Sequence, residues 1–171
     1  MSVATSSRLS VLVRKNEGKR LLSVLIPEIV AKTRLTKSNL KFLPLEDSDP
    51  IQQRFEEFFA ARQTEQGVLA LRTWKDFFAF SQDISKVAST FFNSMMYLFF
   101  QTSDKIGALR LDSRQLFENA PSLLEIDGDS IYACNEDLTC GLVLDKYEED
   151  GCWIYEALVW GDELKAAVLR K

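Results

Sequence analysis

The chain has 171 residues, of which 46% are hydrophobic and 11% aromatic, and its net charge at pH 7 is -4. This composition predicts an ordinary globular protein, and no apolar run approaches the roughly 18 residues that a membrane-spanning helix needs. The chain contains no histidine. That absence excludes Ser-His-Asp and Cys-His catalysis, histidine-ligated zinc and a histidine general base.

Three cysteines, Cys134, Cys140 and Cys152, all lie in the last third of the chain. An odd count without a C-x-x-C motif is typical of reduced thiols, so the sequence predicts a cytoplasmic protein whose cysteines are small buried hydrophobic residues. A cross-strand pair between Cys134 and Cys140 is compatible with their spacing, but nothing in the sequence requires it.

The charged residues are distributed unevenly. Residues 1–41 hold nine Lys or Arg against two acids, a net charge of +7, whereas residues 112–171 hold five against 14, a net charge of -9. The remaining residues, 42–111, hold seven against nine, a net charge of -2. Such asymmetry indicates an interaction surface. The alternative is that the two ends of the chain lie close together in the fold and neutralise each other.

The basic N-terminal segment, residues 1–41, predicts a β-hairpin followed by a helix. Apolar residues alternate over 8–14, and residues 20–26 are again apolar, with turn residues near Asn16–Gly18 between them. A competing interpretation is a helix over 19–32 with a leucine-rich stripe. Because Pro27 would kink that helix, the sequence favours the hairpin and a helix that begins at Pro27.

Residues 42–129 are predicted to be mainly helical, with a central hairpin. Residues 42–50 read as a connecting loop, because they carry two prolines and several acids. Asp49 as the N-cap and Pro50 as the first helical residue start a helix that runs to about Gln63. Apolar residues recur along it at helical spacing, namely Ile51, Phe55, Phe58 and Phe59.

The rest of this middle part alternates between strands and helices. Thr73 and Asp76 form a capping-box pattern ahead of W-K-D-F-F-A-F. The expected elements are a strand over 68–72, helices to about 81 and over 83–92, paired strands over 95–101 and 106–111, and a short helix from 113 to about 119. Ser113 would cap that last helix, and Pro121 would end it.

The last third, residues 130–171, gives the clearest structural pattern. Three short runs rich in Val, Ile, Leu, Tyr and Trp are separated by N-E-D and E-E-D-G, which are turn residues. This pattern predicts an antiparallel β-meander that follows a turn at Asp127–Gly128. Asp162 is expected to cap a final helix that runs to Val168.

Together these elements predict an α+β fold in a single domain that covers residues 1–171. A mostly antiparallel sheet comes from the second half of the chain, and helices are packed on one face of it. No internal repeat is evident in the sequence.

The best candidate for a binding site is the acidic turn of the meander with the strands beside it. Tyrosine and tryptophan surrounded by carboxylates are typical of a hot spot for a basic protein partner. The alternative is a solvated hairpin whose aromatic residues pack beneath it. The predicted partner-binding residues are Asp145, Tyr147, Glu148, Glu149, Asp150, Trp153, Tyr155, Glu156, Asp162 and Glu163.

No catalytic residue, cofactor site or metal ligand is predicted. The acids over 127–137 do not match a calcium-binding loop and read as two polar turns, and there is no glycine-rich phosphate loop. Nucleic-acid binding is not favoured either, because residues 1–41 contain no aromatic side chain and the isoelectric point is about 5.0.

The sequence therefore favours a non-catalytic protein-binding module. An inhibitor or immunity-type protein that neutralises a basic partner, such as a toxin or nuclease, fits the acidic and aromatic C-terminal face. Two alternatives remain open. One is a carboxylate-based enzyme or small-ligand-binding domain, and the other is a nucleic-acid accessory protein that uses the basic N-terminal segment.

Overall fold

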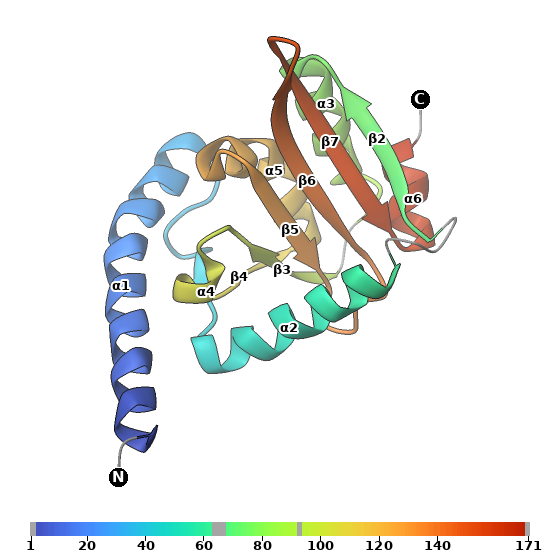
Figure 1. Ribbon diagram of the computed structural model, residues 1–171. Helices are drawn as coiled ribbons and strands as arrows, with labels where there is room; N and C mark the ends of the chain where they lie inside the picture. Colours follow the sequence, from blue (N-terminus) through green and yellow to red (C-terminus); the bar gives the residue numbers. More distant parts are fainter. Residues whose placement is uncertain (1–2, 63–67, 92–93, 170–171) are drawn as a thin grey trace.

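The computed structural model describes residues 3–62, 68–91 and 94–169 of the chain. Figure 1 shows the helices and strands found in these ranges. The helices are α1 (Val3–Lys32), α2 (Leu45–Arg62), α3 (Phe77–Val87), α4 (Ser103–Ile106), α5 (Ser113–Asp127) and α6 (Asp162–Leu169). The strands are β1 (Lys41–Phe42), β2 (Ala70–Trp74), β3 (Met95–Phe99), β4 (Leu109–Asp112), β5 (Ser130–Cys134), β6 (Gly141–Glu149) and β7 (Cys152–Trp160).

The seven strands form one sheet in the order β1-β4-β3-β5-β6-β7-β2, and their pairings are antiparallel. The five central strands come from the second half of the chain, and the two short edge strands come from the first half. This arrangement confirms the α+β class. Residues of α3, α5 and α6 pack on one face of the sheet, and α2 crosses the other face (Figure 1).

Alternation along the strands divides the interior into two cores. In β3, Met96 and Leu98 enter a larger core beneath α3, α5 and α6, whereas Tyr97 and Phe99 enter a smaller core beneath α2. Ile51 and Phe55 are the buried residues that α2 contributes to the smaller core. The sheet is therefore buried on both faces over β3, β5 and the ends of β6 and β7 that lie near α2.

The predicted N-terminal hairpin is wrong, because residues 3–32 form a single helix, α1. Pro27 lies inside this helix and does not begin a new one. Ile29 is fully buried in the larger core, and leucines of the competing helical stripe pack beside it: Leu21, Leu22 and Leu25. The helical interpretation of this stretch was therefore the better one, since burial of one apolar stripe outweighs the penalty that proline imposes on a helix.

The helix in the middle of the chain starts earlier than predicted. It begins at Leu45, so residues 45–50 are helical and Asp49 is not the N-cap. The Pro44 carbonyl accepts hydrogen bonds from the amides of Asp47 and Ser48 at 3.0 and 2.9 Å, which closes the first turn. The expected end near Gln63 lies outside the described residues.

The sequence predicted two helices, one to about residue 81 and one over 83–92, where the structure has the single helix α3. Asp76 is the N-cap of α3, and its carboxylate accepts the Ala79 amide at 2.8 Å; no second helix begins at Asp83. Thr73 belongs to β2 and caps nothing. The helix ends at Val87, which is earlier than the expected end near residue 92.

The predicted end of α5 at Pro121 is wrong, because the helix continues to Asp127. Its N-cap is Asp112, whose carboxylate accepts the Gln115 amide at 2.8 Å, and not Ser113. A proline inside a helix costs about 3 kcal/mol. Each large apolar side chain that α5 buries stabilises the fold by about 1.5–3 kcal/mol, and together these contributions offset the cost of the proline. The buried side chains are Leu116, Phe117, Leu123 and Leu124.

The predicted C-terminal meander is confirmed as β5, β6 and β7. Asp150 and Gly151 have φ angles of 52° and 77°, which is the positive-φ pair of a tight hairpin turn, as the D-G sequence indicates. The final helix is also confirmed, as α6, but Asp162 is its first residue and not its N-cap, because the Lys165 amide donates to the Gly161 carbonyl at 2.9 Å. Within the described ranges, no helix has the length and apolar character needed to cross a membrane.

Candidate functional site

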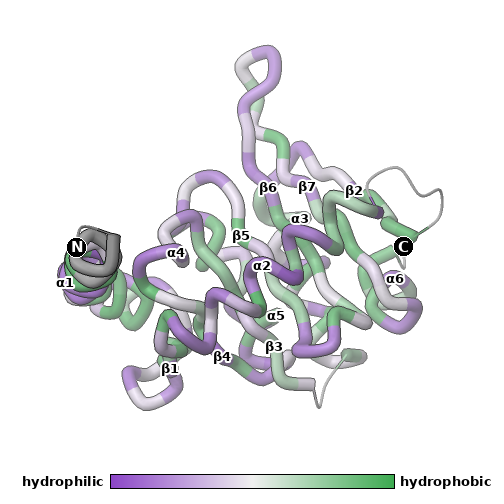
Figure 2. The backbone as a smooth tube through the Cα atoms, turned by 60° about the horizontal axis from the view of Figure 1, so that its bottom comes forward, coloured by the Kyte–Doolittle hydropathy of each residue, from purple (hydrophilic) through white to green (hydrophobic). Residues whose placement is uncertain are grey.

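The β6–β7 hairpin extends beyond the neighbouring strands. β5 pairs with β6 only as far as Asp145, and β2 pairs with β7 only from Tyr155 onward. Residues 146–154 therefore form a two-stranded arm in which β6 and β7 pair only with each other. This arm projects from the rest of the molecule (Figure 2).

The structure places the predicted partner-binding residues of the hairpin on two opposite faces. Side chains alternate along each strand, and the register pairs Asp145 with Glu156 and Tyr147 with Ile154. One side, the open face, is the continuation of the α2 side of the sheet and carries Asp145, Tyr147, Glu149 and Glu156. The other side, the helix face, lies toward α3 and α5 and carries Glu148, Trp153 and Tyr155.

Two carboxylates oppose each other on the open face. Asp145 and Glu156 are direct cross-strand partners, and like charges in this position destabilise a sheet. Burial raises the pKa of Asp145 to about 6, and the charges of Glu156 and Asp129 add to the increase. The Tyr147 hydroxyl donates a long hydrogen bond of 3.4 Å to Glu156. No ion pair to these carboxylates occurs among the described residues.

The helix face is internally paired. Lys146 forms an ion pair of 2.9 Å with Glu125 of α5, and its ammonium group lies 4.7 Å from the centre of the Trp153 ring. Tyr155 is 6% exposed and stacks on Phe80 with ring centres 5.0 Å apart, so it belongs to the core. The aromatic residues on this side are therefore mainly structural, although half of the Trp153 surface remains accessible.

Asp162 and Glu163 are not brought together with the arm. They begin α6 after the last residue of β7, whereas the turn of the arm lies before its first residue. The nine residues of β7 separate the two places by about 26 Å at the usual rise of a strand. The ten predicted residues therefore do not form one continuous surface.

The sequence analysis did not identify the opposition of Asp145 and Glu156. The E-E-D-G turn contained the necessary information, because a two-residue turn fixes the register of the whole hairpin. Counting back from the pair Glu149 and Cys152 places Asp145 opposite Glu156. Asp129 immediately precedes β5 and accepts the amide of Lys146, the residue after Asp145, and only the fold reveals that neighbour.

The ion pairs that residues 1–41 form with other parts of the chain lead to its middle, and among the described residues none leads to residues 112–171. Arg14 of α1 forms a two-pronged ion pair with Asp49 at 2.6 and 2.7 Å, which raises the pKa of the guanidinium. Lys15 lies 3.3 Å from Glu46. The acids of the arm consequently keep their unbalanced charge.

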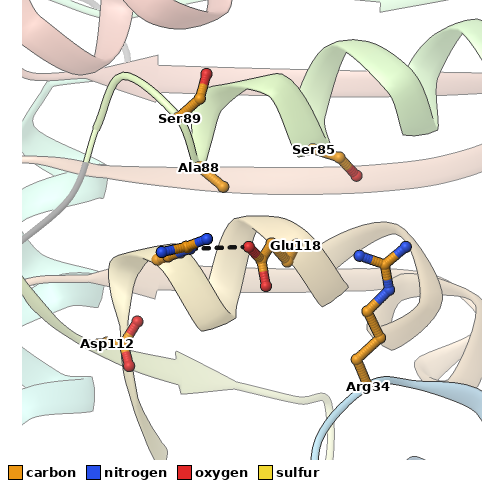
Figure 3. A pocket seen from close by; sticks show the side chains of 7 residues that line it. Arg34, Ser85, Ala88, Ser89, Asp112 and Glu118 are labelled. Carbon is orange, nitrogen blue, oxygen red and sulfur yellow. Dashed lines mark hydrogen bonds and ion pairs between the residues drawn. The ribbon is translucent and has the colours of Figure 1, made fainter.

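A second candidate is a broad cleft of about 840 Å³ between α3 and α5 (Figure 3). Arg114 and Glu118 of α5 form an ion pair across one helical turn at 3.0 Å. The backbone amide of Arg34 is held by Asn119 at 2.8 Å, and Figure 3 shows its side chain rising beside Glu118. Two positive and two negative side chains are among the residues that line the cleft. The lining residues are Arg34, Ser85, Ala88, Ser89, Asp112, Arg114 and Glu118.

The three thiols are free. Burial raises the pKa of Cys134 to about 12 and that of Cys140 to about 11, so both stay protonated and unreactive near neutral pH. Cys152 is exposed at the start of β7. Among the described residues, no group of three acidic or cysteine side chains is placed to hold a metal ion.

Comparison of the chain with protein-family models, with curated proteins and with solved structures finds no match. The function therefore has to be inferred from the geometry of the chain itself.

Proposed function

We propose that this protein is a non-catalytic binding module that captures a basic protein partner on the open face of its β6–β7 arm. An inhibitor or immunity-type protein that neutralises a basic toxin or nuclease in the cytoplasm would work in this way. The observation that carries the proposal is the pair Asp145–Glu156, flanked by Tyr147 and Glu149 on a projecting hairpin, with no cation among the described residues to balance it.

Electrostatics supports this function. Opposed carboxylates on a half-buried sheet surface reduce the stability of the free protein. A lysine or arginine from a partner would remove that repulsion, so part of the binding free energy would come from strain that is already present. The exposed charges near the turn would also accelerate association with a basic surface.

The test compares two triple variants in partner capture. The first, Asp145→Asn, Glu149→Gln and Glu156→Gln, neutralises the open face. The control, Glu57→Gln, Asp162→Asn and Glu163→Gln, removes the same charge elsewhere. A basic protein captured by the wild type and identified by mass spectrometry is then purified and its association rate measured. We expect the rate to fall about tenfold or more for the first variant only. Equal rates for the two variants would contradict the proposal.

One observation favours a second function. Asp145, whose pKa is raised to about 6, lies opposite a second carboxylate, and such pairs can perform acid–base catalysis. Neither carboxylate lines the cleft of Figure 3, and the open face would have to receive a substrate without enclosing it. A carboxylate-based enzyme would lose its turnover in the Asp145→Asn variant while still binding its substrate.

A further inference from the structure

The side of α1 that faces away from the core carries a stripe that is apolar in its first half and basic in its second. At about 100° per residue, this outer stripe covers an arc of about 120°, opposite the side that packs on the core through Leu25 and Ile29. Its residues are Leu9, Leu12, Val13, Asn16, Lys19 and Arg20. The three apolar side chains of the outer stripe are 64%, 58% and 57% exposed, so they form an apolar patch without a cover.

The basic half of the outer stripe is not balanced within the molecule. Lys19 and Arg20 are exposed, and neither forms an ion pair among the described residues. Arg14 and Lys15 of the same helix are, by contrast, paired with acids of α2. The outer stripe therefore presents two unpaired positive charges beside its exposed apolar side chains.

The open face of the arm has the complementary composition. Tyr147 is 40% exposed and supplies an aromatic surface. Carboxylates lie on both sides of it along the hairpin, with Glu149 toward the tip and the pair Asp145–Glu156 toward the root. An aromatic ring between unbalanced carboxylates matches apolar side chains that are followed by unbalanced cations.

The spacing of the two surfaces also agrees. The six residues from Val13 to Lys19 span about 9 Å of helix, and the two residues from Tyr147 to Asp145 span about 7 Å of strand. A helix laid along the arm with Val13 on Tyr147 therefore brings Lys19 to the Asp145–Glu156 pair, because a lysine side chain easily covers the remaining difference. There the cation removes the repulsion between the two carboxylates.

The two surfaces are too far apart to meet within one molecule. Figure 1 shows the tip of the arm at one end of the molecule and the N-terminal end of α1 at the other. The contact therefore has to join two copies of the chain. Two copies that lie side by side in opposite directions make the contact twice, and such a two-fold pair closes and does not grow into a fibre.

We propose that two copies of this chain pair in this way, each docking the outer stripe of its α1 on the open face of the other copy's arm. Charge complementarity sets the orientation of the pair, and the cover over the apolar side chains stabilises it. The inference goes beyond the proposed function and does not require the basic partner. A second copy and that partner would compete for the open face.

Sedimentation equilibrium of the full chain tests the pairing directly. We expect the mass to rise with concentration from that of one chain to that of two at low salt, and the rise to disappear at 1 M salt, where the Debye length is about 3 Å. The mass of one chain at every concentration, or a mass that grows past two chains, would overturn the proposal. Binding to phosphatidylserine vesicles by a chain that stays single would assign the outer stripe to a lipid surface instead.

Charge reversal at two places identifies the surfaces. Lys19→Glu with Arg20→Glu makes the outer stripe negative, and Glu149→Lys with Glu156→Lys makes the open face positive. We expect each double variant alone to pair about tenfold or more weakly, because like charges then meet at both contacts. An equal mixture of the two should recover the pairing as a mixed dimer, since each stripe then meets an arm of opposite charge. A mixture that stays single would contradict the assignment.

An uncharged variant tests the apolar half of the outer stripe. Leu9→Ser with Val13→Ser removes two of its exposed side chains. The matched control is Val24→Ser with Val30→Ser, because these valines are 66% and 41% exposed farther along the same helix. We expect the first variant to weaken pairing about tenfold or more and the control to pair as the wild type does. Equal pairing of the two variants would exclude the outer stripe as the docking surface.

The same measurements separate this inference from the proposed function. A chain that stays single at every concentration but captures a basic partner would remove the pair and leave the proposed function standing. A chain that pairs, while its capture of the partner is unaffected by neutralising the open face, would remove the proposed function and leave the pair.

Discussion

Asp145 combines three properties that rarely occur together in a residue with only a structural role. It is half-buried, it faces Glu156 across the hairpin, and its pKa is raised to about 6. A carboxyl group whose pKa is higher in the folded state than in the unfolded chain stabilises the fold when protonated. Its contribution is therefore fully present below about pH 4 and is lost as the pH rises through 6.

We predict that Asp145→Asn stabilises the protein at pH 7, because the neutral amide removes the repulsion from Glu156. The gain should be on the order of 1 kcal/mol after allowance for solvent screening, and it should disappear near pH 4. Urea unfolding of the wild type and the variant at pH 4, 5.5 and 7 measures it. If the difference in the free energy of unfolding between the two proteins does not change with pH, charge repulsion at Asp145 does not destabilise the fold.

Gly141 illustrates a tight contact that follows from packing. A Cβ atom at this position would collide with the Trp160 ring and with the carbonyl oxygen of Ala133. The Trp160 ring has little freedom to move, because its Nε1 atom donates to the Leu138 carbonyl at 2.9 Å.

We therefore predict that Gly141→Ala destabilises the fold by about 1–3 kcal/mol, which is the usual range for overpacking. Thermal unfolding followed by circular dichroism measures the effect. An unchanged melting temperature would mean that the Trp160 ring is free to shift.

At the scale of elements, the prediction succeeded where local pattern and tertiary environment agree. The three strands of the meander have period-two alternation and turn residues with a defined backbone geometry, and both signals survive in the fold. It failed at Pro27, Pro50 and Pro121, which were all treated as helix boundaries but lie inside helices. In each case the loss of one backbone hydrogen bond is outweighed by apolar burial that a local rule does not include.

Gly18 is a second case in which a local rule fails, because the sequence pattern places it in a turn. It lies inside α1, and a Cβ atom there would collide with the carbonyl oxygen of Lys105 in α4. The glycine allows close contact between the two helices, and Lys105 strengthens this contact through an ion pair with Glu17 at 2.9 Å.

This contact gives a prediction whose sign is opposite to helix propensity. Alanine normally stabilises an exposed helix by about 1 kcal/mol relative to glycine. We expect Gly18→Ala instead to lower the free energy of unfolding, because the methyl group separates α1 from α4. The control is Asn16→Ala, an exposed position of the same helix, which should be neutral or stabilising. A stabilising effect of Gly18→Ala would show that α1 does not lie against α4.

For the candidate site, the sequence indicated the hairpin but not how its residues are distributed over the two faces of the arm. The acidic composition of the turn was visible, and so was the pairing rule that joins Asp145 to Glu156. The burial of Tyr155 depends on Phe80, 75 positions earlier in the chain, and no local pattern contains that information.

For the molecule as a whole, the charge separation in the sequence survives folding. Arg14 and Lys15 of α1 form ion pairs with acids of α2, whereas the arm carries Glu148, Glu149 and Asp150 without ion pairs among the described residues. The protein therefore presents one strongly negative end.

This polarity predicts how capture of a basic partner depends on salt. The Debye length falls from about 10 Å at 0.1 M salt to about 3 Å at 1 M, so the association rate should fall steeply while dissociation changes little. Glu148→Lys, Glu149→Lys and Asp150→Lys together should slow association and flatten the salt dependence, with little change in the dissociation rate. Stopped-flow or surface plasmon resonance measurements distinguish these effects. Association rates independent of salt would argue against electrostatic steering.

The arm also has a consequence for solubility. Beyond Asp145 and before Tyr155, both strands have an outer edge that no neighbouring strand covers. Free edges of this kind recruit strands from other molecules and start aggregation. The acids at the tip place like charges on any second arm that approaches, so they oppose edge-to-edge association. Neutralising them should therefore make the protein aggregate at lower concentration, even if no partner is present.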